Sequence, residues 1–125
     1  MNEFGSLMYS PETVSGEALK KKESHIPKIK APDTVKSGEV FEMEVFVGPH
    51  PSSVEHSIKW IEVYFYEEGR GFNPVHLATI TFTPEYVEPS VKIKLKLRRS
   101  GILYVLGYCN LHGIWESRKE IKVVS

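Results

Sequence analysis

The sequence has only one cysteine, Cys109, so the chain cannot form a disulfide within itself. This excludes a small secreted domain held together by disulfide bonds. Neither sign of charge is in excess, because 16 basic and 16 acidic residues give a formal net charge of +0. The chain therefore lacks the overall positive charge typical of proteins that bind nucleic acid or an anionic membrane.

Long apolar runs are also missing. No stretch approaches the roughly 18 apolar residues that are needed to cross a bilayer. The first residues, MNEFGSLMYSPET, lack the charged-then-apolar order of a signal peptide. We therefore expect a cytoplasmic protein without a membrane partner, in which a free thiol stays reduced. With 125 residues the chain has the length of one ordinary domain.

Alternation of apolar and polar residues is the main pattern that is present. It is clearest in residues 90–98, SVKIKLKLR, where valine, isoleucine and leucine share one face and lysines share the other. Turn signals rich in glycine and proline separate further apolar, β-branched and aromatic runs, at 41–47, 58–66, 75–82, 101–108 and 120–124. The pattern predicts an all-β fold, an immunoglobulin-like antiparallel sandwich of about seven strands. Residues 1–22, which end in three lysines, are expected to form an N-terminal arm, and 23–125 the folded domain.

The histidines lie in unusual places for a β protein. Only His76 falls inside a strand pattern, where we expect a hydrogen-bonded or surface side chain. The other four lie in or beside turn-like segments: His25, His50, His56 and His112. Cys109 precedes the last of these by three positions. Imidazole and thiolate are preferred ligands of iron, copper and zinc, and sandwich loops can bring distant segments to one ion. The set predicts a metal site.

The residue pattern alone leaves the kind of site open. Structural zinc usually takes ligands from paired short spacings, and this chain has only one closely spaced pair. Copper sites of cupredoxins generally add a methionine soon after the last histidine, whereas Trp115 follows here. A copper site would also leave two loop histidines unused. A cupredoxin-like electron carrier and a metal-free immunoglobulin-like interaction module remain the alternatives, and metal analysis would separate them.

Three segments carry a family resemblance. In this order, ESHIP, HPSSVEH and YCNLHGIW resemble the superoxide reductases of the small one-domain type, the neelaredoxins, over about residues 23–125. The resemblance implies a mononuclear non-haem iron with four equatorial histidines and one axial cysteine. On this sequence the implied ligands are His25, His50, His56 and His112, with Cys109 axial. The implied activity is the one-electron reduction of superoxide to hydrogen peroxide.

The same resemblance implies further properties. Glu23 would become the sixth ligand of the oxidised iron and stand aside when the iron is reduced. A rubredoxin-like protein would supply the electron, and the chain would assemble as a homotetramer. One residue departs from the pattern, because many members have lysine between the glutamate and the histidine where this chain has Ser24. The departure puts in doubt the role of a lysine at that position in steering superoxide to the iron.

Overall fold

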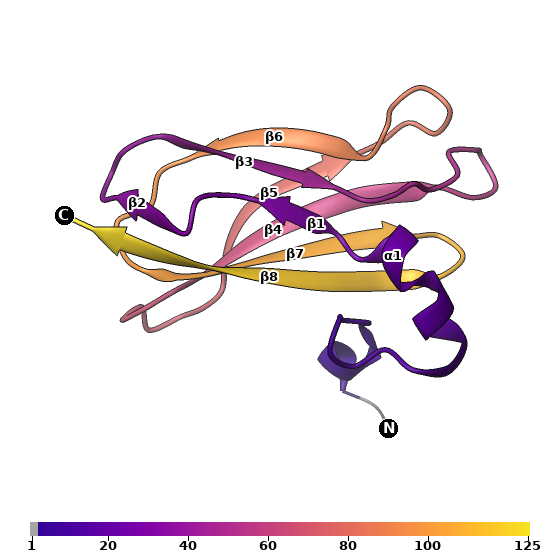
Figure 1. The fold of residues 1–125 in the computed structure, drawn as a ribbon, viewed down its shortest axis with the longest axis horizontal. Coiled ribbons are helices and arrows are strands. Elements are labelled where there is room, and N and C mark those ends of the chain that lie inside the picture. Colours follow the sequence, from indigo (N-terminus) through magenta and orange to yellow (C-terminus); the bar gives the residue numbers. More distant parts are fainter. Residues whose placement is uncertain (1–2) are drawn as a thin grey trace.

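The computed structural model describes residues 3–125, and the chain forms two β-sheets packed face to face (Figure 1). The smaller sheet has the order β1 (Lys28–Lys30), β3 (Phe41–Phe46) and β6 (Ser90–Leu95). The larger sheet has the order β2 (Thr34–Lys36), β8 (Gly113–Val124), β7 (Gly101–Cys109), β4 (Ile58–Glu67) and β5 (Val75–Thr81). All pairings are antiparallel except that of β2 with β8. The predicted antiparallel sandwich is confirmed, with eight strands in the described chain.

The alternating sequence pattern explains how the two sheets hold together. Met43 and Val45 of β3 are fully buried, and they share one core with side chains of the larger sheet such as Ile61, Phe65 and Leu103. Burying an aliphatic or aromatic side chain of this size contributes about 1.5 to 3 kcal/mol, so the inner faces supply most of the drive to fold. The predicted lysine face of β6 is exposed to solvent, as expected.

Two parts of the fold differ from the expectation. The last strand begins at Gly113 and not near residue 120, because its first half pairs with β7 from Cys109↔Gly113 onward. This half contains the polar run 116–119, in which no apolar alternation is visible. The strands β1 and β2 were not predicted, since three residues are too few to display a period of two.

The segment before β1 lies against the edge of the larger sheet. It contains short helical turns, namely the 3-10 helices η1 (Phe4–Leu7) and η2 (Gly16–Lys21) and the α-helical turn α1 (Lys22–His25). Tyr9 donates its backbone N–H to Ile114 of β8 and accepts a hydrogen bond from Glu116, and its ring packs 4.7 Å from that of Trp115. No helix of residues 3–125 is long and apolar enough to cross a membrane.

The strand directions bring three segments to one end of the sandwich. The turn α1 runs directly into β1, the loop 47–57 joins β3 to β4, and residues 110–112 join β7 to β8. All three lie at the right-hand end of the molecule in Figure 1. These are the segments that contain the predicted ligands, and we call this end of the sandwich the histidine end.

Candidate metal centre

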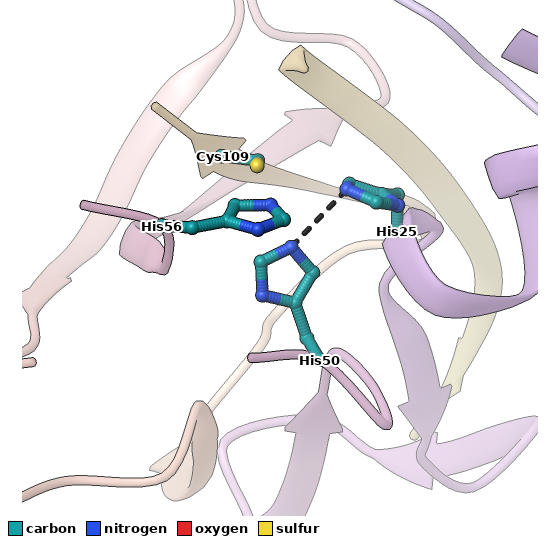
Figure 2. A group of neighbouring side chains, drawn as sticks. All are labelled: His25, His50, His56 and Cys109. Carbon is teal, nitrogen blue, oxygen red and sulfur yellow. Dashed lines mark hydrogen bonds between the residues drawn. The ribbon is translucent and has the colours of Figure 1, made fainter. Parts of the chain in front are cut away.

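Four of the five predicted ligands converge at the histidine end. His25 belongs to α1, His50 and His56 lie in the loop after β3, and Cys109 is the last residue of β7. One donor atom from each, three imidazole nitrogens and one sulfur, lies within 4.8 Å of all the others. Figure 2 shows the rings of His25, His50 and His56 gathered around one point, with the sulfur of Cys109 beside them. Segments that are distant in the sequence therefore present a set of soft and borderline donors to one point.

The fifth predicted ligand, His112, borders this group. Its Nδ1 lies 3.5 Å from the Cys109 sulfur, and its ring centre lies 5.0 Å from that of His25 and 5.1 Å from that of His56. The hairpin that carries it closes through Gly113 at a φ of +86°, a conformation that favours glycine. This turn brings His112 back beside the cysteine that precedes it in the chain.

Hydrogen bonds to the outer nitrogens orient two of the imidazoles. His25 Nδ1 lies 3.0 Å from the Lys21 carbonyl oxygen and 2.8 Å from the Ser24 hydroxyl, and His50 Nδ1 lies 2.8 Å from the Pro51 carbonyl. A carbonyl can only accept, so each Nδ1 carries the proton and donates it. The two Nε2 atoms then offer lone pairs, and they lie 3.2 Å apart at the centre of the cluster. This is the arrangement by which proteins present histidine to a metal.

His56 supplies an independent test of whether a metal fits. Its Nε2 is buried and has no hydrogen-bond partner among residues 3–125, although burying a polar nitrogen without a partner costs free energy. A cation at the centre of the cluster would satisfy this atom. Cys109 is fully buried beside it and has no second cysteine with which to pair. The residues present therefore fit a metal ion that accepts both nitrogen and sulfur.

The electrostatics of the site keep three of the imidazoles neutral. The pKa of His25 is lowered to about 4, mainly by burial and then by the neighbouring His50 and His112, against the opposing hydrogen bond to the Lys21 carbonyl. The pKa of His50 is lowered mainly by burial and then by its histidine neighbours. Burial and the charge of Lys21 also lower the pKa of His112. At neutral pH these rings are therefore unprotonated, which is the form that binds metal.

Two predicted residues lie beside the cluster. Glu23 is exposed on α1, and its carboxylate is not among the grouped donor atoms. Ser24 is half-buried, and its hydroxyl donates to the Lys21 carbonyl while lying next to His25. His76 lies elsewhere, on β5, where its Nε2 is 2.7 Å from the Thr79 hydroxyl. The expectation of a hydrogen-bonded surface histidine is confirmed for His76.

Sequence reasoning missed the residues that join the ligand segments to one another. The Asn110 amide donates to the Glu55 carbonyl at 2.8 Å and accepts from the Ser57 backbone at 3.0 Å, so it ties the Cys109 hairpin to the residues on either side of His56. Lys28 bridges two other ligand segments, and Lys21 places its charge near two of the imidazoles. The only sequence signal for any of them was an asparagine in a turn directly after the cysteine.

Comparison with known proteins gives one consistent result. The family model described as desulfoferrodoxin matches residues 17–118. The chain is 38% identical over 108 residues to a superoxide reductase of Pyrococcus abyssi, covering 82% of this chain and 90% of that one. It is 34% identical over 116 residues to a neelaredoxin of Megalodesulfovibrio gigas, with coverage of 81% and 88%. A solved superoxide reductase (neelaredoxin) from Ignicoccus hospitalis superposes with a TM-score of 0.93 at 57% identity, covering 98% of this chain and 100% of that one.

Proposed function

The chain belongs to the desulfoferrodoxin family and is a superoxide reductase with a mononuclear iron centre, and we propose that five of its side chains hold this iron. The proposed ligands are His25, His50, His56 and His112, with Cys109 as the sulfur ligand. The observation that carries the assignment is the convergence of four donor atoms within 4.8 Å, together with a buried His56 Nε2 that has no partner among the residues the structure describes. The position of the His112 Nδ1 beside the sulfur supports the fifth.

The reaction requires one electron and two protons for each superoxide, which leaves as hydrogen peroxide. When bound, ferrous iron supplies the electron, and with one thiolate and neutral imidazoles it carries a net charge of about +1 that favours an anion. The Nδ1–H groups of His25 and His50, held by carbonyl oxygens, keep their Nε2 lone pairs directed at the metal position. The buried Cys109 closes the inner side of the site to water. The ligand loops at the outer side reach solvent, which supplies the protons.

Glu23 is the proposed sixth ligand in the oxidised state. It is exposed and lies two residues before His25, so its carboxylate has room to approach the metal position and to withdraw. Because its side chain is not one of the grouped donors, the geometry supports a reversible contact better than a permanent one. We assign residues 23–125 to the iron-binding domain and residues 1–22 to the arm.

The remaining proposals concern partners and location. A rubredoxin-like protein is the proposed electron donor, and the exposed Val54 and Leu111 on ligand-bearing loops give it an apolar contact area near the metal. A homotetramer is the proposed assembly, supported by an apolar groove on the outer face of the larger sheet that contains Trp60 and Tyr104. The single unpaired cysteine supports a reducing, cytoplasmic location. Reduction kinetics with purified rubredoxin and light scattering at several concentrations test the first two.

Elemental analysis of the purified protein, combined with a visible spectrum before and after oxidation, tests the metal assignment. We expect one iron per chain and a thiolate-to-iron charge-transfer band that appears on oxidation. Superoxide should be consumed with formation of peroxide and without release of dioxygen. Stoichiometric copper, or a metal-free protein that still consumes superoxide at the same rate, would refute the proposal.

A further inference from the structure

Lys28 joins two of the segments that contain ligands. Its ammonium donates to the Glu23 carbonyl and to the Gly48 carbonyl, each at 2.7 Å. The first carbonyl lies two residues before His25, and the second lies two residues before His50. One side chain therefore connects α1 to the loop after β3, and its contact with Gly48 spans 20 residues of sequence.

The position of Lys28 in the sheet explains why a connection is needed there. Lys28 pairs with Phe46 at the end of the β1–β3 ladder. Beyond this pair both segments leave the sheet: the residues before β1 form α1, and the residues after β3 form the loop 47–57. No backbone pairing between β1 and β3 extends past that point, yet the Nε2 atoms of His25 and His50 come to 3.2 Å from each other. The ammonium provides hydrogen bonds where the ladder no longer does.

The chemistry of the contact makes it selective and strong. Hydrogen bonds from a charged donor are about twice as strong as those between neutral groups. The lysine is half-buried, and its ammonium lies 5.3 Å from the centre of the Phe46 ring, which restricts the side chain. The ammonium therefore donates two of its three N–H groups, one to a carbonyl of α1 and one to a carbonyl of the loop after β3.

We propose that Lys28 is a positioning residue of the metal site, which sets the spacing of the His25 and His50 segments and thereby slows the loss of iron. It touches neither substrate nor metal and acts through the two backbone carbonyls. The inference rests on the proposed assignment of His25 and His50 as ligands. It adds a residue outside the ligand set whose effect on the metal can be measured separately from activity.

The test compares iron-loaded variants of the full chain at a temperature well below unfolding. Lys28→Met removes the donors and keeps the apolar stem, Lys28→Arg restores a charged donor, and Lys30→Met removes an exposed lysine two residues along the same strand. Release of ferrous iron to a chelator should be at least about tenfold faster in Lys28→Met, which corresponds to about 1.4 kcal/mol and is a lower bound for the loss of charge-assisted hydrogen bonds. It should be largely restored to the parent rate in Lys28→Arg. Lys30→Met should match the parent.

Hydrogen exchange gives a second readout that does not depend on iron chemistry. Peptides covering residues 22–27 and 47–51 should exchange faster together in Lys28→Met, while peptides from β7 stay protected. If Lys28→Met does not fold, Lys28→Gln replaces it in both measurements, because its shorter neutral side chain cannot reach both carbonyls.

The outcomes separate this inference from the proposed ligand set. The role of Lys28 is overturned if Lys28→Met releases iron at the rate of the parent. It is also overturned if Lys30→Met accelerates iron release as much as Lys28→Met does. A fall in unfolding temperature with unchanged iron release assigns Lys28 to general stability only and overturns the inference as well. Should His50→Ala retain full iron content and the parent spectrum, the ligand assignment itself fails, whatever Lys28 does.

Discussion

The two ends of the sandwich use the same structural devices and hold different chemistry. Each end has a hairpin whose turn contains a glycine at positive φ, Gly113 at one end and Gly69 at the other. An asparagine side chain bound to backbone groups secures a turn at each end, Asn110 at the histidine end and Asn73 at the opposite end. The loops of the opposite end are thus stabilised by the same kinds of contact as the loops that contain the ligands.

The side chains that the turns present are what differs. At the opposite end a groove is lined by charged groups of both signs, among them Asp33 and Lys119, which form an ion pair with each other. The carboxylate of Asp33 and the ammonium of Lys119 satisfy each other at the surface. At the histidine end, three rings and a thiol point at one another without such compensation, and the His56 Nε2 has no partner within the described part of the chain. Turn architecture therefore positions side chains at either end, whereas the need for a metal arises only from the donors.

Replacing the sulfur should give the largest effect. In Cys109→Ser the hydroxyl is a much weaker donor to iron than a thiolate, and we expect the oxidised charge-transfer band to disappear together with most reductase activity. The control is His76→Ala on β5, which should leave spectrum and activity unchanged. Visible spectra and superoxide consumption measure both variants. A band that persists in Cys109→Ser would show that the sulfur is not a ligand.

Acid should weaken the metal-free protein through the histidine end. The pKa of His25 is lowered to about 4 in the folded chain, from 6.5 when unfolded. As the pH falls from about 6.5 to about 4, the unfolded chain binds this proton and the folded chain does not, so up to about 3 kcal/mol of stability is lost. Urea unfolding of metal-free protein over this pH range measures the loss.

Two variants localise that pH effect. His25→Gln should flatten the dependence, whereas His76→Gln should preserve it, since His76 is exposed and lies outside the cluster. Equal pH dependence in His25→Gln and in the parent would show that the acid sensitivity has another source.

The matched asparagines test whether the turn contacts at the two ends differ in their effect on iron binding. Asn110→Ala loses contacts to Glu55 and Ser57, and Asn73→Ala loses contacts to Glu67 and Arg70. Each should reduce the free energy of unfolding by about 1 to 2 kcal/mol. Of these two variants, Asn110→Ala alone should also accelerate release of iron to a chelator, because Asn110 holds ligand segments together and Asn73 does not. Urea unfolding and chelator assays measure the two effects, and equal iron release in both variants would contradict this distinction.

The sequence predicted donors better than it predicted the contacts that hold them. The strands 41–46 and 90–95 were visible because one face is apolar, whereas the first half of β8 was not, since its pairing with β7 overrides a polar sequence. Histidine and cysteine could be recognised as candidate metal ligands from residue type alone. The role of Lys28 depends on a carbonyl 20 residues away, and no local pattern encodes that distance.

The smallest expected effect concerns Ser24, where many family members have lysine. A unit charge about 6 Å from superoxide contributes roughly 0.7 kcal/mol in water and about 2.8 kcal/mol at an effective dielectric constant of 20. The site opens to solvent through its ligand loops, so the lower value applies more closely, and at about 0.15 M salt a Debye length near 8 Å weakens it further. The chain also already has a positive charge near the cluster, because the charge of Lys21 lowers the pKa of both His25 and His112.

We therefore expect Ser24→Lys to accelerate the reaction with superoxide by less than about tenfold at low ionic strength, with the gain shrinking as salt rises. Ser24→Ala is the matched control, because it removes the hydroxyl beside His25 without adding charge, and the Lys21 carbonyl still holds that ring. Pulse radiolysis or stopped-flow rates across a salt series measure all three proteins. A gain that survives high salt would have to come from the altered contact with His25, since a screened charge cannot produce it. A hundredfold gain at low salt would mean that the site without this lysine is poorly suited to superoxide, and that the charge of Lys21 does not substitute for it.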